Sequence, residues 1–345
     1  MLASRPAARS AGLALLALLL TASPAPAQKY TDAAAAVRAG FGHLRTRDYE
    51  AAVGPLEDAR DLLSEGRAAN AQPSRDLLNV QRALLTTYGE LGETEDYWDT
   101  GDWILRHADS PATRSLTMRA MRRYARGKRD RDQLREHYEA ALTADPNDRI
   151  ALRLLSELAE DDRDPKAAAE RLGRLIDLDA ATPAGPDRRD RAEYARLLEQ
   201  SDEHERAATL FAELAAEAEQ LEAARAENGE NGGRADGEDA TPFGPSLTAA
   251  NLHLKTARNW LEADRTDEAR EAAATADRLG DAGLDTPHDY YFHSFLGGVW
   301  AKLDEPAKAL PHFEKAAEVA TIDGYRKSSR EAAQKARDAI AASDQ

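Results

Sequence analysis

A run of arginine side chains between residues 114 and 135 is the part of this sequence best suited to binding chemistry. It holds nine basic and two acidic residues, although the whole chain has a formal net charge of −16. Arg119, Arg123 and Arg126 are four and three residues apart, so they share one face of a predicted helix. A guanidinium group is a planar fork that pairs well with carboxylates. This face therefore predicts a site for an acidic peptide segment or a free C-terminal carboxylate.

The same helical face continues into later segments of the chain. Its further basic members are Arg153, Arg189, Arg196, Lys255 and Arg258. Together with the first three arginines they would line a groove. A second interpretation stays open, because Glu157, Glu160, Glu193 and Glu199 are interleaved with these residues. Pairing within and between helices would then leave a neutral, salt-bridged surface.

The sequence has no recognisable catalytic constellation. The motifs HExxH, GxSxG and GxxxxGK[ST] are all absent. His288, His293 and His312 are not spaced by three or four residues, as ligands on one helical face would be, so no metal ion is predicted. The aromatic residues 290–292 beside them are expected in the core. We therefore expect neither a cofactor nor an enzyme, and a hydrolase with an unrecognised site is the weakest of three functional alternatives.

The composition constrains the elements that must position these side chains. Of the 345 residues, 42% are hydrophobic, 31% are charged and only 6% are aromatic, a balance that favours helices. The length exceeds what one compact core covers, which leaves two domains or a repeat protein whose core grows linearly. Cysteine is absent, which excludes disulfides and thiolate metal sites. The acidic balance argues against a nucleic-acid partner.

The stretch 293–316 contains a complete two-helix unit. Gly297 and Ala309 carry little side chain, so two helices can approach closely there, while Trp300 and Phe313 fill the space beside the crossing. The signature residues of this and related copies are Gly40, Ala52, Tyr138, Pro146, Ala168, Phe211, Leu296, Gly297, Trp300, Ala309 and Phe313. Their spacing resembles that of the tetratricopeptide repeat, which has a 34-residue period.

This resemblance implies an all-α, tetratricopeptide-like solenoid of helical hairpins, with about seven repeats in a right-handed superhelix and a C-terminal capping helix. It also implies that the first helix of each pair lines a concave groove that binds peptides or protein segments without performing chemistry. The leading hypothesis is therefore a protein–protein interaction scaffold. The alternative is a structural subunit that holds a larger assembly together through its convex face or its ends.

The ends and one internal segment differ from the repeats. Residues 1–27 have a basic start, an apolar run and an Ala25-Pro26-Ala27 cleavage pattern, which predicts a secretory signal peptide. The chain would be exported, to the periplasm in a double-membraned bacterium or otherwise secreted, with no membrane span left after cleavage. The predicted divisions are repeats one to five at 28–225, a disordered acidic glycine-rich loop at 226–245, repeats six and seven at 246–320, and a capping helix with tail at 321–345.

Overall fold

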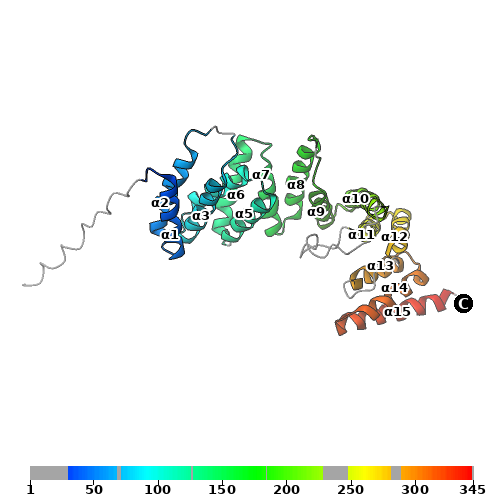
Figure 1. Ribbon diagram of the computed structural model, residues 1–345. Coiled ribbons are helices and arrows are strands. Elements are labelled where there is room, and N and C mark those ends of the chain that lie inside the picture. The colour runs from blue at the N-terminus through cyan, green and yellow to red at the C-terminus, as the bar shows by residue number, and fades with distance from the viewer. Residues whose placement is uncertain are drawn as a thin grey trace, which may run out of the picture. The chain divides into compact units, whose positions relative to one another are not determined.

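A computed structural model describes residues 30–67, 71–125, 127–183, 185–227, 248–280 and 289–343. This part of the chain contains fifteen helices and no strand (Figure 1). The predicted signal peptide lies outside it, as do Arg126, His288 and the predicted loop, apart from residues 226 and 227 at the end of a helix.

The chain divides into two compact units, residues 1–134 and 135–345. The helices of the first unit are α1 (Ala33–Arg45), α2 (Tyr49–Ser64), α3 (Arg75–Leu91), α4 (Thr94–His107), α5 (Pro111–Tyr124) and the beginning of α6 (Lys128–Ala144). The second unit continues with α7 (Arg149–Asp161), α8 (Pro165–Ala180), α9 (Arg188–Gln200), α10 (His204–Glu227), α11 (Ala249–Glu262), α12 (Thr266–Gly280), α13 (Tyr290–Lys302), α14 (Pro306–Val319) and α15 (Asp323–Ser343).

Successive helices pack as hairpins. The pairs α1–α2, α3–α4, α7–α8, α9–α10, α11–α12 and α13–α14 are each in contact, and α5 and α6 take the place of the third pair along the chain. Seven pairs and the additional helix α15 confirm the predicted all-α, tetratricopeptide-like fold class. Contacts also join neighbouring hairpins within each unit, for example α2 to α3 in unit 1 and α8 to α9 in unit 2, so a hairpin buries its apolar face between neighbours.

Short polar side chains start many of these helices. Asp32, Ser74 and Asp148, for example, accept hydrogen bonds from free backbone N–H groups in the first turns of α1, α3 and α7. The turns inside five of the hairpins share a residue in the left-handed region of backbone conformation, with φ between 59° and 63°. It occupies the same place in five hairpins, as Arg47, Arg163, Asp202, Asp264 and Asp304. The repeat is therefore visible in the backbone as well as in the side chains.

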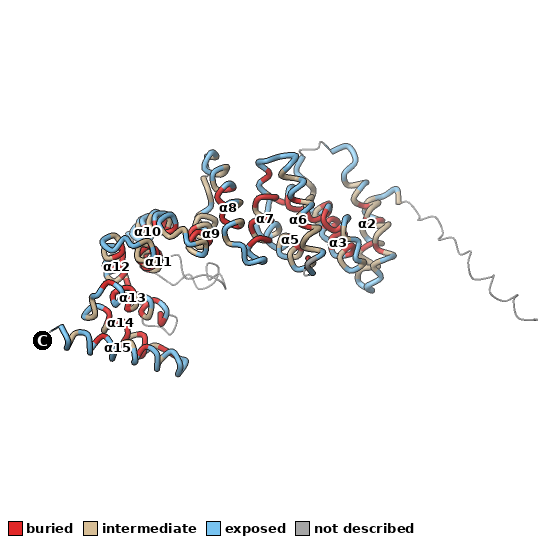
Figure 2. Tube along the Cα trace, turned by 180° about the vertical axis from the view of Figure 1, so that it is seen from behind, coloured by how far each residue is buried: buried red, intermediate tan, exposed pale blue. Residues whose placement is uncertain are grey.

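Small residues set the distance between paired helices, as expected. A Cβ atom added to Gly40 would lie 2.6 Å from the Leu56 side chain, and one added to Gly297 would lie 2.9 Å from the Phe313 ring. Large side chains fill the space beside these contacts, and Trp300, Tyr138 and Phe211 are at most 1% exposed. Figure 2 shows that buried residues recur along the facing sides of the helices in each unit.

The remaining signature residues lie where the repeat pattern places them. Ala52, Ala168, Leu296 and Ala309 are fully buried on α2, α8, α13 and α14, whereas Pro146 is exposed in the turn after α6. The helix α15 packs on α14 through Ala333 and Ala336 and leaves its other side exposed. Within the described residues no helix is both long and apolar enough to cross a bilayer.

The adjacent glycines of α13 provide a direct test of this packing. Exchanging either for alanine favours the helix by up to about 1 kcal/mol. At Gly298 the added methyl group meets nothing within 4 Å, so Gly298→Ala should raise the midpoint of thermal unfolding. At Gly297 the methyl group meets Phe313, so Gly297→Ala should lower the free energy of unfolding by about 1–2 kcal/mol. Equal shifts in the two variants, measured by circular dichroism, would contradict this account of the hairpin.

Candidate protein-interaction surface

We call the odd-numbered helices α1 to α13 the first helices of their hairpins, and we call the side that carries the predicted basic residues the first-helix face. The predicted residues lie on four of these helices, one in unit 1 and three in unit 2. Arg119 and Arg123 lie on α5 in unit 1, and Arg153, Arg189, Arg196, Lys255 and Arg258 lie on α7, α9 and α11 in unit 2. The two units are considered separately.

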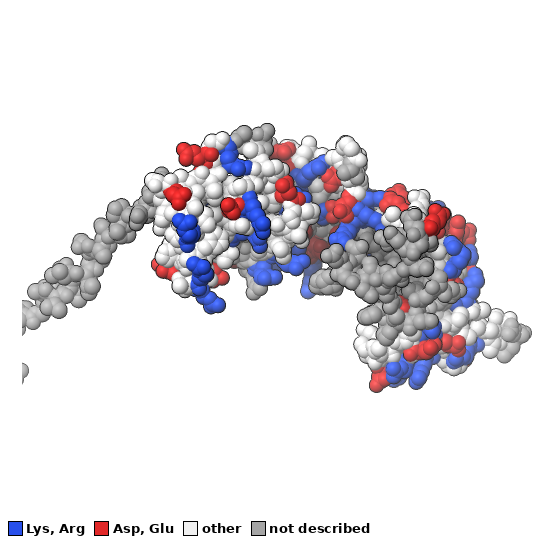
Figure 3. Space-filling model, viewed as in Figure 1, with Lys and Arg blue, Asp and Glu red and all other residues white. Residues whose placement is uncertain are grey.

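In unit 2 carboxylates neutralise most of these cations. Arg153 pairs with Asp190 on the next first helix, and Arg196 pairs with Glu193 and, at 2.5 Å, with Glu160. Farther along, Arg258 lies 3.7 Å from Glu199, and Lys302 lies 2.7 Å from Glu262. We call these pairs the ion-pair ladder, because they connect α7, α9, α11 and α13 in sequence. Acidic and basic side chains accordingly lie against one another in this part of Figure 3.

Burial affects two charged groups of this surface. Loss of solvent raises the pKa of Asp190, although the charge of Arg153 opposes the shift. Burial likewise lowers the pKa of Lys255, whose Nζ atom lies 4.8 Å from the centre of the Phe211 ring. Arg189 is exposed on α9. For Arg153, Arg196 and Arg258 the structure therefore matches the salt-bridged interpretation of the sequence.

The first helices of unit 1 differ from those of unit 2. Seven exposed arginines lie on them. Arg114 donates a hydrogen bond to the Ala108 carbonyl oxygen, and the other six are Arg38, Arg45, Arg75, Arg82, Arg119 and Arg123. Among the residues that the structure describes, none of the six makes an ion pair with a carboxylate. The cause lies in the sequence, because neither α1 nor α5 contains any aspartate or glutamate. Among the described residues, the positive charge of these six side chains is thus uncompensated in an otherwise acidic protein.

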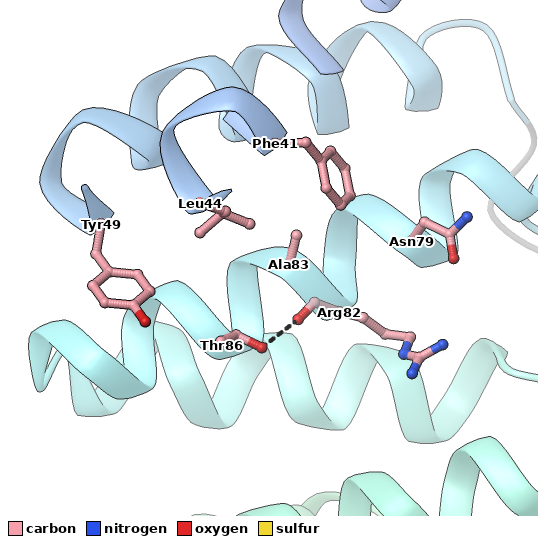
Figure 4. Close-up of a pocket in the computed structure, with 7 residues that line it drawn as sticks. All are labelled: Phe41, Leu44, Tyr49, Asn79, Arg82, Ala83 and Thr86. Atoms are coloured by element: carbon pink, nitrogen blue, oxygen red, sulfur yellow. Dashed lines mark hydrogen bonds between the residues drawn. The ribbon is translucent and has the colours of Figure 1, made fainter. Parts of the chain in front are cut away.

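A shallow hollow of about 430 Å³ lies between α1 and α3 of unit 1 (Figure 4). Phe41, Leu44 and Tyr49 line it from α1 and the start of α2. Asn79, Arg82, Ala83 and Thr86 line it from α3, where the Thr86 hydroxyl donates to the Arg82 carbonyl oxygen at 3.1 Å. The hollow therefore combines apolar surface with the Arg82 side chain, which makes no ion pair within the described part of the chain, and this mixture is typical of protein-binding sites. We did not predict it from the sequence, because Arg82 is isolated along the chain.

Exposed aromatic side chains form a second feature, in unit 2. Tyr291 on α13 is 52% exposed, Phe295 on α13 is 43% exposed and Tyr325 on α15 is 39% exposed. We call these three residues the aromatic ridge. The expectation that residues 290–292 belong to the core is correct for Tyr290 and Phe292 but wrong for Tyr291. Tyr291 is four residues from Phe295, so both lie on the outer side of α13.

Two histidines meet in unit 2 although they are far apart in sequence. The Nδ1 atoms of His293 and His312 are 3.2 Å apart, and His312 Nε2 lies 3.2 Å from Asp277. Spacing along one helix does not detect this contact, because the rings come from the two helices of one hairpin. The described residues contain no group of three or more potential ligands that could hold a metal ion.

No family model matches the chain, and no curated protein is similar to it. Among solved structures, MamA is 18% identical, with a TM-score of 0.36 over 60% of this chain and 95% of its own. A tetratricopeptide repeat protein from Parabacteroides merdae is 11% identical, with a TM-score of 0.32 over 88% of this chain and 98% of its own. PilF of Pseudomonas aeruginosa is 16% identical, with a TM-score of 0.30 over 73% of this chain and 93% of its own.

The helical hairpins described above decide the architecture. The fold is tetratricopeptide-like.

The ion-pair ladder predicts a pH-dependent stability. In Arg153→Met, the half-buried Asp190 loses its counter-charge, and its folded-state pKa rises further above the unfolded value. When the pKa of a carboxyl group is higher in the folded state than in the unfolded state, the free energy of unfolding falls as pH rises through these two pKa values. The reason is that the folded state must then hold a charged carboxylate in a poorly solvated site. The variant should therefore be about 1–2 kcal/mol less stable than the parent at pH 7, and nearly equal to it near pH 4.

Urea unfolding of the parent and the variant at both pH values measures this difference. The double variant Arg153→Met/Asp190→Asn serves as the control, because it removes both charges and should regain most of the loss at pH 7. A loss of stability in Arg153→Met that is the same at both pH values would show that Arg153 does not stabilise the charged form of Asp190.

Proposed function

We propose that this protein is an exported, non-enzymatic scaffold that binds an acidic protein segment on the first-helix face of unit 1. The observation that carries the proposal is the contrast between the two units. Arginines on the first helices of unit 2 are largely paired with carboxylates, whereas the six named arginines on α1, α3 and α5 have no such partner among the described residues. A tetratricopeptide-like fold supports the role of a protein-interaction scaffold in general terms.

The chemistry of the hollow supports a ligand with two properties. Phe41 and Leu44 offer apolar contact area, which supplies much of the affinity in protein interfaces. Arg82 at the hollow, and Arg119 and Arg123 on α5, offer guanidinium groups that select carboxylates and speed association. A segment that combines aspartate or glutamate with aliphatic or aromatic side chains would satisfy both.

This proposal changes the set of residues predicted to bind the partner. Arg119 and Arg123 remain in it, and Arg38, Arg45, Arg75 and Arg82 join it. An external carboxylate at Arg153, Arg196 or Arg258 would have to displace an existing partner, so these three residues are assigned to the stability of unit 2. Arg189 and Lys255 are not required.

Export is proposed on the sequence of residues 1–27 alone. The basic start, the apolar run and the Ala25-Pro26-Ala27 pattern support a cleaved signal peptide. In a double-membraned source the partner would then be a periplasmic or membrane-associated protein with an exposed acidic segment. Under the alternative of a structural subunit, the chain would co-purify in a fixed assembly whose formation does not depend on the unit 1 arginines.

Charge reversal tests the proposed surface. A fluorescent ten-residue peptide of alternating acidic and large apolar residues is titrated with the protein at physiological ionic strength, where the Debye length is about 8 Å. The triple variant Arg82→Glu/Arg119→Glu/Arg123→Glu should bind it at least about tenfold more weakly, because three attractions become repulsions. Its helicity should stay unchanged, since all three side chains are exposed.

The matched control is Arg67→Glu/Lys166→Glu/Arg174→Glu, which changes the net charge equally at exposed positions outside the proposed set. This control should retain binding within about twofold, because a distant charge is screened by salt. Equal weakening of both triple variants would reduce the effect to net charge and would contradict a site on unit 1.

A further inference from the structure

We propose that a second hollow of unit 1 binds a primary ammonium group, carried either by a lysine side chain or by a small free amine. This hollow has a volume of about 300 Å³ and lies between α2, α3 and α4. We call it the acidic hollow. Among its lining residues are Gln81 and Tyr88 on α3 and Asp96, Asp99, Thr100 and Trp103 on α4. The proposal does not depend on the function assigned to the arginines of this unit.

Two of these lining residues are polar although they are almost completely buried. Gln81 is 5% exposed and Thr100 is 6% exposed. Neither side chain makes a hydrogen bond to any other residue that the structure describes. Buried polar groups in folded proteins nearly always have a partner. A ligand in the acidic hollow would supply one to both, in place of the solvent that otherwise serves them.

The charges at the acidic hollow favour a cation. Asp96 and Asp99 are exposed, and neither makes an ion pair within the described part of the chain. They are three residues apart, so both carboxylates lie on one face of α4. Arg60 of α2 also lines the hollow, but its Nε atom lies 3.0 Å from Asp61. Three carboxylates against one guanidinium group leave a local charge of −2.

The hydrogen-bonding groups of the hollow select donors. The Tyr88 hydroxyl donates to the Glu57 carboxylate at 2.8 Å, so its oxygen can accept a hydrogen bond but has no second proton to give. Burial and this bond raise the pKa of Tyr88, which keeps the hydroxyl protonated at neutral pH. The side-chain oxygens of Gln81 and Thr100 can accept as well. An ammonium group carries three N–H donors and no acceptor, so it matches this set.

A metal ion is the other class of cation, and the composition of the hollow disfavours it. Ca²⁺ takes about six to eight oxygen ligands, and Mg²⁺ requires octahedral geometry. The described residues contain no group of three or more His, Asp or Glu side chains that could hold a metal ion. Trp103 lines the hollow instead, with its ring stacked on His107 at a centroid distance of 4.5 Å. Aromatic rings attract ammonium groups through their π electrons, so an ammonium group fits this lining better.

The acidic hollow lies on the opposite side of α3 from the hollow in Figure 4. Gln81 and Tyr88 line the acidic hollow, whereas Asn79 and Ala83 line the other. Because successive residues of a helix turn by about 100°, these two pairs lie about half a turn apart. The two hollows of unit 1 can therefore be tested separately.

The experiment titrates the isotopically labelled full chain with n-butylamine, and with a glycine–serine nonamer that has one central lysine, at physiological ionic strength. The nuclear magnetic resonance signal of the Trp103 indole N–H reports binding, and Trp103→Phe assigns this signal. Neutral comparison probes are n-butanol and a nonamer with norleucine in place of lysine. We expect a saturable shift with at least one of the two ammonium probes and with neither neutral probe.

Two variants should weaken this binding. Asp96→Asn/Asp99→Asn should weaken it at least about tenfold, because charge-assisted hydrogen bonds become neutral ones. Gln81→Leu should weaken it about threefold to tenfold, since one acceptor is lost. The midpoint of thermal unfolding should not fall in Gln81→Leu, because its amide group loses no partner among the described residues.

Two controls separate this site from other effects. Glu170→Gln/Glu271→Gln removes the same charge at exposed positions on α8 and α12, and it should bind the ammonium probes within about twofold of the parent. The Arg82→Glu/Arg119→Glu/Arg123→Glu variant should also bind them within about twofold, even if it loses the acidic peptide. The two proposals can therefore fail independently.

The two ammonium probes distinguish the source of the group. Tighter binding of the lysine nonamer would support the site and assign it to a lysine of a protein segment. Tighter binding of n-butylamine would support the site and assign it to a small free amine.

Three results would overturn the inference. One is the absence of a saturable shift with both ammonium probes. Another is equally tight binding of the neutral probes, which would assign the hollow to apolar groups. The third is equal weakening by the two double carboxylate variants, which would reduce the effect to net charge. A lower midpoint of unfolding in Gln81→Leu without weaker binding would overturn the role given to Gln81.

Discussion

The close approach of two helices within each hairpin is the contact on which the structure depends. It requires a position without a side chain on one helix, as at Gly40 or Gly297, and a large residue opposite, as at Leu56 or Phe313. A hairpin so formed is apolar on more than one side and is stable only between neighbours. Within each unit, first helices consequently come into contact, as α1 with α3 and α11 with α13, which brings together residues from separate repeats.

Much of this fold could be predicted from the sequence, because the signals are local. The spacing of small and large residues in 293–316 defines a hairpin, and similar spacings define the others. The left-handed turn residues, such as Asp264 and Asp304, occupy equivalent places in the repeats and show that the register extends to the backbone. The division after residue 134 was not predicted, since no composition change marks it.

The functional surface was less predictable, because it depends on contacts between repeats. Arg196 and Glu160 are 36 residues apart, and nothing along the chain distinguishes this pair from an exposed arginine and glutamate. The sequence argument selected Arg119 and Arg123 because they belong to a dense basic run. It passed over Arg82, which is isolated in sequence but lies beside a hollow formed with another hairpin.

The absence of acidic residues from α1 and α5 has a kinetic consequence. An electric field reaches only about 8–10 Å at physiological ionic strength, so the charges of one face act on an approaching molecule before distant charges do. A protein with a net charge of −16 would slow the approach of acidic molecules in general. The uncompensated arginines of unit 1 would reverse that effect locally, so the proposed acidic segment would reach them faster than it would reach the rest of the surface.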